Sequence, residues 1–329
     1  MFKAVIRGIG SYVPDQVLTN ADLEQMVDTS DEWIVSRTGI RERRIAPPDM
    51  ATSDLGYFAA KEAIANAGLT PADIDMLIVA TSTPDHQFPP VACLLQERLG
   101  CRTIPAYDLS ATCIGFLSAL ETAEQFIQTG KLQHILIVGA DTLSRITDYT
   151  DRTTCILFSD GAGAFVLSRD DSATPQAETG IRYTATHADG TYFPSLYVPA
   201  GGSRHPQPND QAEKAKIVME GRKIFRLAVT SMTEAAKQAL HATRMSLDEI
   251  DWVIPHQANQ RIIDAVAEHL EVPAEKMIST VADFGNNSAA TIPLAMHTAI
   301  KEGRIKRGDT LMLLAFGGGL VWGCVVLTY

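Results

Sequence analysis

The chain has 329 residues, of which 46% are hydrophobic, enough for two domains or one large double unit with an extensive core. Its 28 Lys and Arg residues against 39 Asp and Glu give a net charge of −11, which argues against nucleic-acid binding through a general basic field. The five cysteines are an odd number without metal-ligand spacing, and no secretory signal precedes them. We therefore expect reduced thiols, no metal and a cytoplasmic location.

The N-terminal part predicts alternating strands and helices. An apolar run ends in Gly8 and Gly10, but Val13 occupies the third glycine position of a dinucleotide fingerprint, so that interpretation is discarded. Residues 21–44 are predicted to be helical, with an exposed Trp33. A second helix, from about residue 53 to residue 67, is predicted to lead into the strand that starts MLIVA at residue 76.

Residues 108–120, DLSATCIGFLSAL, predict a strand, a tight turn and a helix. Cys113 would then lie at the N-terminus of that helix, where unpaired N–H groups stabilise an anion. We expect its thiol to ionise below the free value of about 8.5, which would make it a ready nucleophile. From this stretch alone, a small buried structural cysteine is the alternative.

The last 19 residues, LMLLAFGGGLVWGCVVLTY, carry no charge and approach the length of a membrane-spanning helix. Glycine is unfavourable inside helices, and three consecutive glycines interrupt this stretch at positions 317–319. We therefore predict two buried strands joined by a tight loop, and no membrane insertion.

An internal repeat relates the two parts of the chain. GLTPADIDMLIVA, from residue 68, aligns with RMSLDEIDWVIPH, from residue 244, at an offset of 176 residues, and the same offset aligns residues 135–140 with 311–316. The repeat predicts two similar α/β halves, residues 1–175 and 176–329, joined near residues 168–180. Their strands are apolar throughout, as expected of sheets covered by helices on both faces.

The repeat also brings candidate residues together. The turn that carries Cys113 should face its equivalent at residues 283–291, which contains Asn286, while His256 follows a predicted strand. A cysteine, a histidine and a carboxamide in this order indicate nucleophilic acyl transfer. Papain-like proteases use the same order, but their cysteine motif lies near the N-terminus of secreted, disulfide-bearing chains, so the context does not fit.

Over essentially its whole length the chain resembles the β-ketoacyl-acyl carrier protein synthase III family. The matching stretches are GIGSYVP, TNADLEQMVDTSDEWIVSRTGIRERR, the cysteine turn, FSDGAGA, VIPHQANQRI, FGNNSAAT and FGGGLVWG. The resemblance implies an α/β thiolase-like duplicated fold, with five αβαβα layers and two halves related by a pseudo-twofold axis. It also implies a decarboxylative Claisen condensation that starts fatty-acid chains, with an acyl-CoA and malonyl-acyl carrier protein as substrates and no cofactor.

The resemblance implies a role for individual residues. Cys113 would carry the acyl group, with its own N–H and that of Gly318 as the oxyanion hole, and His256 and Asn286 would donate hydrogen bonds to the enolate. The CoA-binding residues would be Thr29, Trp33, Arg37 and Arg152. The acyl pocket would use Phe88, from a neighbouring subunit of a homodimer, with Met219 and Phe225. The carrier protein or the CoA phosphates would contact Arg222, Lys223, Arg226 and Arg261.

Several positions depart from the family pattern. Ile114 follows the nucleophile where a smaller residue is usual, Leu320 and Val321 replace Phe and Thr, Ser159 and Thr153 replace glycines, and residues 199–216 form a long polar loop. These departures leave the acyl chain length open. Two other functions also stay open: a related condensing or acyl-transfer enzyme of secondary metabolism or with a longer primer, and a non-catalytic protein that binds CoA esters or carrier protein.

Overall fold

The computed structural model describes residues 2–171, 179–206 and 215–329. The first half contributes β1 (Lys3–Tyr12), β2 (Val17–Thr19), α1 (Asn20–Glu24), α2 (Asp31–Thr38), β3 (Glu42–Arg44), α3 (Thr52–Asn66), β4 (Met76–Ala80), α4 (Val91–Leu99), β5 (Ala106–Leu109), α5 (Gly115–Gln128), β6 (His134–Thr142) and β7 (Asp160–Asp170). The second contributes β8 (Gly180–Ala188), β9 (Leu196–Tyr197), β10 (Val218–Met219), α6 (Gly221–Thr243), β11 (Trp252–Pro255), α7 (Gln260–Leu270), α8 (Val281–Phe284), α9 (Thr291–Lys301), β12 (Thr310–Gly317) and β13 (Val321–Thr328).

Two mixed sheets form the core of the molecule. The first has the strand order β1-β7-β6-β4-β5 and the second the order β11-β12-β13-β8. Each sheet contains a pair of parallel neighbours, β4 with β6 or β11 with β12, and an antiparallel strand follows the pair, β7 or β13. Strands β4, β6 and β12 are buried along their whole length. The predicted apolar strands are therefore covered on both faces.

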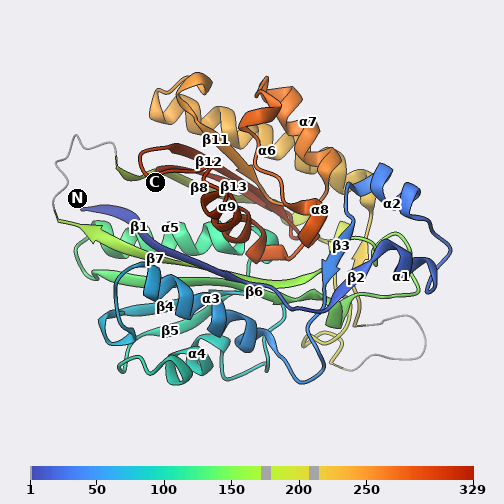
Figure 1. The fold of residues 1–329 in the computed structure, drawn as a ribbon, viewed down its shortest axis with the longest axis horizontal. Coiled ribbons are helices and arrows are strands. Elements are labelled where there is room, and N and C mark those ends of the chain that lie inside the picture. Colours follow the sequence, from blue (N-terminus) through green and yellow to red (C-terminus); the bar gives the residue numbers. More distant parts are fainter. Residues whose placement is uncertain (1, 172–178, 207–214) are drawn as a thin grey trace.

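The elements stack in five layers (Figure 1). Helices α3 and α4 cover the outer face of the first sheet, α5 and α9 lie between the two sheets, and α6 and α7 cover the outer face of the second sheet. This arrangement confirms the predicted αβαβα fold. The predicted boundary at residue 175 lies outside the described residues. Residues 207–214 of the polar loop 199–216 also lie outside them.

The repeat holds in detail at the turns that precede the central helices. A 3₁₀ turn at Thr112–Ile114 comes before α5, and another at Ser288–Ala290 comes before α9, at the offset of 176 that relates the strands. Thr112 and Ser288 open these turns with left-handed φ angles of 50° and 52°. Non-glycine residues rarely adopt this conformation, which costs on the order of 1–3 kcal/mol.

The predictions for residues 21–44 and for the last 19 residues have different outcomes. The prediction of one helix over residues 21–44 is wrong in its extent: α1 ends at Glu24, and Ser30 caps a separate helix α2. Gly39, with a φ of 75°, terminates α2 after Thr38, and β3 follows. The prediction of two strands in the last 19 residues is confirmed, because β12 and β13 flank the glycines. In the described residues, no helix has the length and apolarity needed to cross a bilayer.

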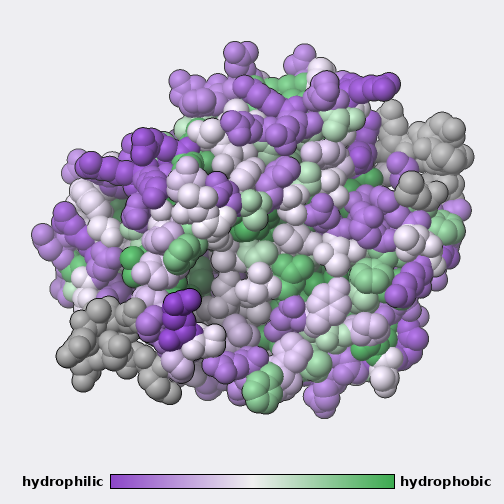
Figure 2. Space-filling model, turned by 180° about the vertical axis from the view of Figure 1, so that it is seen from behind, coloured by the Kyte–Doolittle hydropathy of each residue, from purple (hydrophilic) through white to green (hydrophobic). Residues whose placement is uncertain are grey.

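Figure 2 shows hydrophilic residues gathered along the top, over α6 and α7, and hydrophobic ones scattered below.

Candidate active site

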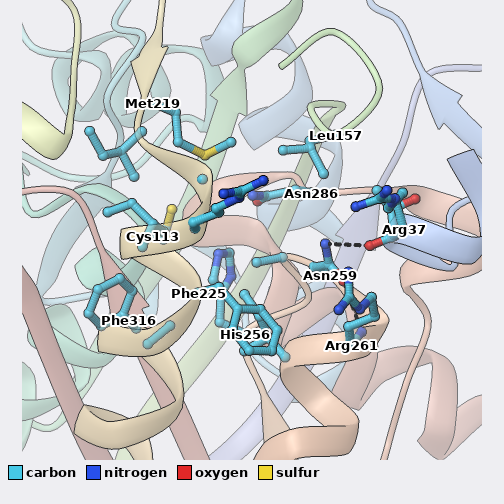
Figure 3. Close-up of a pocket in the computed structure, with 18 of the residues that line it drawn as sticks. Arg37, Cys113, Leu157, Met219, Phe225, His256, Asn259, Arg261, Asn286 and Phe316 are labelled. Atoms are coloured by element: carbon cyan, nitrogen blue, oxygen red, sulfur yellow. Dashed lines mark hydrogen bonds between the residues drawn. The ribbon is translucent and has the colours of Figure 1, made fainter. Parts of the chain in front are cut away.

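One cavity of about 630 Å³ contains all three predicted catalytic residues, Cys113, His256 and Asn286, in its wall. They come from separate elements, namely the turn before α5, the loop after β11 and the loop after α8. Figure 3 shows the sulfur, the imidazole and the carboxamide around one space. The sequence prediction that both halves contribute to one cleft is therefore confirmed by the geometry.

Cys113 lies in the 3₁₀ turn, two residues before the first residue of α5. The residue is partly exposed and lines the cavity, and burial of its thiol raises the pKa of Cys113 to about 12. A hydrogen bond from the Ser288 side chain works in the opposite direction, and the nearby charge of Asp141 adds to the rise. The expectation of an acidified thiol is therefore wrong for the free protein, because loss of solvation outweighs the helix terminus.

His256 follows the last residue of β11 and is only 3% exposed. Burial lowers the pKa of His256 to about 3, so the imidazole is neutral at physiological pH. Its Nδ1 lies 2.7 Å from the hydroxyl oxygen of Thr291, the first residue of α9. The ring is thus fixed from one side, and its other nitrogen remains for chemistry in the cavity.

Asn286 is held at three points. Its backbone N–H donates to the Leu157 carbonyl at 2.9 Å, and its own carbonyl accepts from the Ser159 N–H at 3.0 Å. The side-chain oxygen Oδ1 accepts from the Ser288 N–H at 2.9 Å. With that oxygen occupied, the amide NH₂ is the end of the side chain that can donate to a ligand in the cavity.

Ser288 connects all three predicted catalytic residues. Its N–H orients Asn286, its side chain is a hydrogen-bond partner of the Cys113 thiol, and its carbonyl accepts from the Thr291 hydroxyl that contacts His256. The residue is 2% exposed and has a left-handed backbone. The sequence analysis did not single out Ser288 or Thr291, although both lie in the quoted motif FGNNSAAT.

Asp141, at the end of β6, lies behind this turn and is completely buried. Its Oδ1 accepts from the Ser82 N–H at 2.7 Å and the Thr83 hydroxyl at 3.0 Å, and its Oδ2 accepts from the Ala289 N–H at 3.4 Å. The side chain of Ser288 is a further partner. The carboxylate therefore binds the turn at Ser288–Ala290 to the first half of the molecule.

Gly317 passes very close to Cys113, the predicted nucleophile. A Cβ at this position would lie 2.4 Å from the Thr112 hydroxyl and 2.9 Å from the Cys113 backbone nitrogen, closer than real Cβ contacts. Gly317 lines the cavity, and the carbonyl of the next residue, Gly318, accepts from the Thr112 hydroxyl at 3.0 Å. The Gly318 N–H as an oxyanion donor stays a prediction.

Two of the four predicted CoA-binding residues, Trp33 and Arg37, line the cavity, and Figure 3 shows Arg37 on the opposite side from Cys113. The guanidinium groups of Arg37 and Arg152 lie 5.7 Å and 4.9 Å from the centre of the Trp33 ring. The Arg37 carbonyl accepts from Asn259 at 3.1 Å, which joins α2 to α7. Within the part of the chain that the structure describes, the buried Thr29 hydroxyl has no hydrogen-bond partner.

The remaining predicted site residues divide into two groups. Those in the cavity wall are Arg222, Arg226, Arg261, Met219 and Phe225. Lys223 instead contacts the carboxylate of Glu220 at 3.5 Å and the ring of Tyr192 at 5.3 Å. Phe88 is 82% exposed and is not part of the cavity wall in the single chain.

Comparison with known proteins gives consistent matches. A family model described as 3-oxoacyl-[acyl-carrier-protein] synthase III matches residues 107–190, and the model of its C-terminal part matches residues 240–329. The chain is 48% identical over 329 residues to the β-ketoacyl-[acyl-carrier-protein] synthase III of Sinorhizobium medicae, covering 100% of both chains. The crystal structure of the 3-oxoacyl-[acyl-carrier-protein] synthase III of Aquifex aeolicus is 45% identical, with a TM-score of 0.91 over 99% of this chain and 100% of that one.

A priming β-ketosynthase from a polyketide biosynthetic pathway is also similar, with 32% identity and a TM-score of 0.91 over 99% of this chain and 96% of that one. The duplicated five-layer fold, with a cysteine, a histidine and an asparagine in one cavity, defines a thiolase-like condensing enzyme, which is an acyltransferase. Within that class, the full-length identity shows that the chain belongs to the β-ketoacyl-[acyl-carrier-protein] synthase III family.

Proposed function

We propose that this enzyme joins an acyl-CoA primer to malonyl-acyl carrier protein through an acyl thioester on Cys113, and thereby initiates fatty acid synthesis. The observation that carries the proposal is the meeting of Cys113, His256 and Asn286 in one cavity of about 630 Å³. The full-length similarity to β-ketoacyl-[acyl-carrier-protein] synthases III supports the choice of substrates.

In the first half-reaction, the Cys113 sulfur attacks the thioester carbonyl of the acyl-CoA. The N–H groups of Cys113 and Gly318 stabilise the oxyanion that forms on the carbonyl oxygen. When this intermediate collapses, the bond to the CoA sulfur breaks, and CoA leaves as a thiol with the proton that Cys113 has lost. The acyl group remains on Cys113 as a thioester.

In the second half-reaction, the malonyl thioester loses its carboxylate as CO₂, and the electron pair of the broken bond forms an enolate. Asn286 donates to the enolate oxygen at any physiological pH, and His256 adds a second donor when its Nε2 carries a proton. The enolate carbon attacks the acyl thioester, and the released Cys113 thiolate takes up one proton. Because decarboxylation itself supplies the carbanion, we expect no metal or cofactor.

Cationic side chains in and beside the cavity wall support two negatively charged substrates. The indole of Trp33, with Arg37 and Arg152, suits a flat base and its phosphates. A further basic group would contact the phosphates or an acidic carrier protein, and it consists of Arg222, Lys223, Arg226 and Arg261. These cations stand out in a chain of net charge −11.

We further propose a homodimer in the cytoplasm. Phe88 is a large apolar side chain with 82% exposure, and a second copy of the chain would bury it at the acyl pocket of that copy, beside Met219 and Phe225. Analytical ultracentrifugation of the wild type and of the variant Phe88→Asp tests this arrangement. A wild type that sediments as a monomer would contradict it.

The central test uses radiolabelled acyl-CoA and mass measurement of the intact protein. We expect a mass increase of one acyl group on the wild type, none on Cys113→Ser, and a normal increase on the control Cys101→Ser, which changes a cysteine outside the cavity wall. Addition of malonyl-acyl carrier protein should then release the label as a β-ketoacyl product. An unlabelled wild type would favour a non-catalytic binding protein.

The similarity to a polyketide priming β-ketosynthase favours a second candidate, a condensing enzyme of secondary metabolism or one that uses a longer primer. The large cavity is compatible with it. A panel of acyl-CoAs of increasing length, with malonyl-acyl carrier protein and malonyl-CoA compared as acceptors, separates the two. Preference for acetyl-CoA and the carrier protein supports fatty acid initiation, and preference for a long primer supports the second candidate.

A further inference from the structure

Arg43, in β3, is a cation in the interior of the protein that no step of the proposed reaction uses. The residue is 0% exposed. Burial lowers the pKa of Arg43 to about 10, so the guanidinium still carries its charge at physiological pH. A buried cation is costly unless hydrogen bonds replace its hydration. The groups that its N–H donors hold therefore indicate what this residue does.

The guanidinium holds the backbone of the cavity wall. Its Nε donates to the carbonyl of Ile156 at 3.0 Å, its Nη2 donates to the same oxygen, and Ile156 lines the cavity. On the other side, Nη1 donates to Oδ1 of the buried Asn20. The amide of Asn20 donates in turn to the Asp31 carboxylate at 2.7 Å and to the Ile40 carbonyl at 2.9 Å. Arg43 thus fixes a wall residue to a buried anchor in the first part of the chain.

The wall that Arg43 holds is also the support of Asn286. Leu157, which follows Ile156, accepts the backbone N–H of Asn286 at 2.9 Å. From the other direction, the stem of Arg43 packs against Gly285, where a Cβ would lie 3.3 Å from Cγ of the arginine. Arg43 therefore contacts the residue just before Asn286 and also the residue next to its backbone partner.

We propose that Arg43 is a positioning residue that holds Asn286 in place in the cavity. It acts through the backbone at residues 156–157 and through its contact with Gly285. This inference rests on the proposed condensation and assigns a further residue to its second half-reaction. A donor must lie within about 0.5 Å of its productive place, and a misplacement of about 1 Å can lower a rate about 100-fold. Cys113 comes from a different element, the turn before α5, so we expect its acylation not to depend on Arg43.

Two variants weaken the hold on the wall to different degrees. The planar guanidinium presents N–H groups on two sides, towards Ile156 and towards Asn20. Arg43→Lys keeps the charge and a long stem but leaves one nitrogen, which cannot reproduce this arrangement. Asn20→Ala is milder, because it leaves Arg43 in place and removes only the acceptor on its far side.

Two controls separate positioning from stability. Arg307→Lys makes the same change in an arginine that donates to two backbone carbonyls, those of Ile6 and Arg7, outside the cavity wall. Ile64→Ala removes a buried side chain from α3, which covers the outer face of the first sheet. It destabilises the core without changing a residue around Asn286.

The two half-reactions are measured separately, as single-turnover acylation by radiolabelled acetyl-CoA and as condensation of the acyl-enzyme with malonyl-acyl carrier protein. In Arg43→Lys we expect condensation to fall about 10- to 100-fold, with acylation at saturating acetyl-CoA within about twofold of the wild type. Asn20→Ala should show a smaller fall in the same step, and both controls should keep the wild-type ratio of the two rates. Equal falls in both steps of Arg43→Lys would indicate a general loss of structure and overturn the proposal.

A double-mutant cycle shows whether Arg43 acts through Asn286. In the background of Asn286→Ala, the further change Arg43→Lys should slow condensation by less than about twofold, because the group that it positions is already missing. The full fall of about 10- to 100-fold in both backgrounds would mean that Arg43 acts in another way, and the proposal would be wrong.

Crystal structures give a readout that does not depend on the reaction. We expect the Asn286 carboxamide to move by about 0.5–1 Å relative to Cys113 in Arg43→Lys, or in Asn20→Ala if the first variant does not fold. An Asn286 that keeps its place in the variant would overturn the proposal. A wild type that forms no β-ketoacyl product, together with the expected displacement in the variant, would refute the proposed function alone.

Discussion

The reactivity of Cys113 towards an alkylating reagent should increase with pH far beyond the range of an ordinary thiol. The thiolate is the reactive form, and burial raises the pKa of Cys113 to about 12. At pH 8 about one molecule in 10⁴ would carry the thiolate, whereas about a quarter of free cysteine, with a pKa near 8.5, would be ionised. Because the pKa lies above the accessible range, each unit of pH should raise the rate about tenfold.

The measurement is the rate of iodoacetamide labelling between pH 6.5 and 9.5, with the modified peptide identified by mass spectrometry. We expect the labelling rate to increase tenfold with each pH unit, with no plateau below pH 9.5. Cys113→Ser gives the background from the other cysteines, and unfolded protein gives the ordinary thiol profile. A plateau below pH 8 would refute the reasoning, because it would reveal a thiolate stabilised by the helix terminus or by an imidazolium.

Three further outcomes follow from the geometry. Gly317→Ala should lower kcat by about 100-fold, because the new Cβ displaces the backbone of Cys113, and Gly190→Ala, where a Cβ meets open space, should be active. Asn286→Ala should still form the acyl-enzyme but condense about 10² to 10³ times more slowly, as separate assays of the two half-reactions would reveal. Asp141→Asn should lower the free energy of unfolding, measured in urea, by about 1–3 kcal/mol, because an NH₂ group would face the Ala289 N–H. Unchanged stability would contradict the role of this carboxylate.

The meeting of Cys113, His256 and Asn286 in one cavity was predictable because the sequence carries two independent signals for it. The motifs around Cys113, His256 and Asn286 indicate acyl transfer, and the repeat at an offset of 176 residues indicates that their loops meet. The repeat also predicts the pairing of the turns at Thr112–Ile114 and Ser288–Ala290, which the structure contains. Local sequence and internal symmetry together were sufficient for this part of the site.

The properties that depend on how deeply a side chain is buried were not predictable from the sequence in the same way. A helix N-terminus is visible in the sequence and favours a thiolate, but the burial that raises the pKa of Cys113 comes from residues far away along the chain. Asp141 contacts a turn 148 residues away, and the Thr112 hydroxyl contacts a carbonyl 206 residues away. No local pattern marks such partners, so their effects on charge and orientation appear only in the folded molecule.

The duplication also explains why the supporting residues lie where they do. Two equivalent turns contact each other between the sheets, and each opens with a residue in a left-handed conformation, Thr112 or Ser288. In the first turn the next residue is Cys113, the predicted nucleophile, whereas in the second it is Ala289, which leaves Ser288 and Thr291 free to hold other groups. One copy of the turn thus supplies the reactive sulfur and the other orients the groups around it. Since each strained turn packs against its equivalent, a change in the second half should alter the chemistry of a sulfur that belongs to the first.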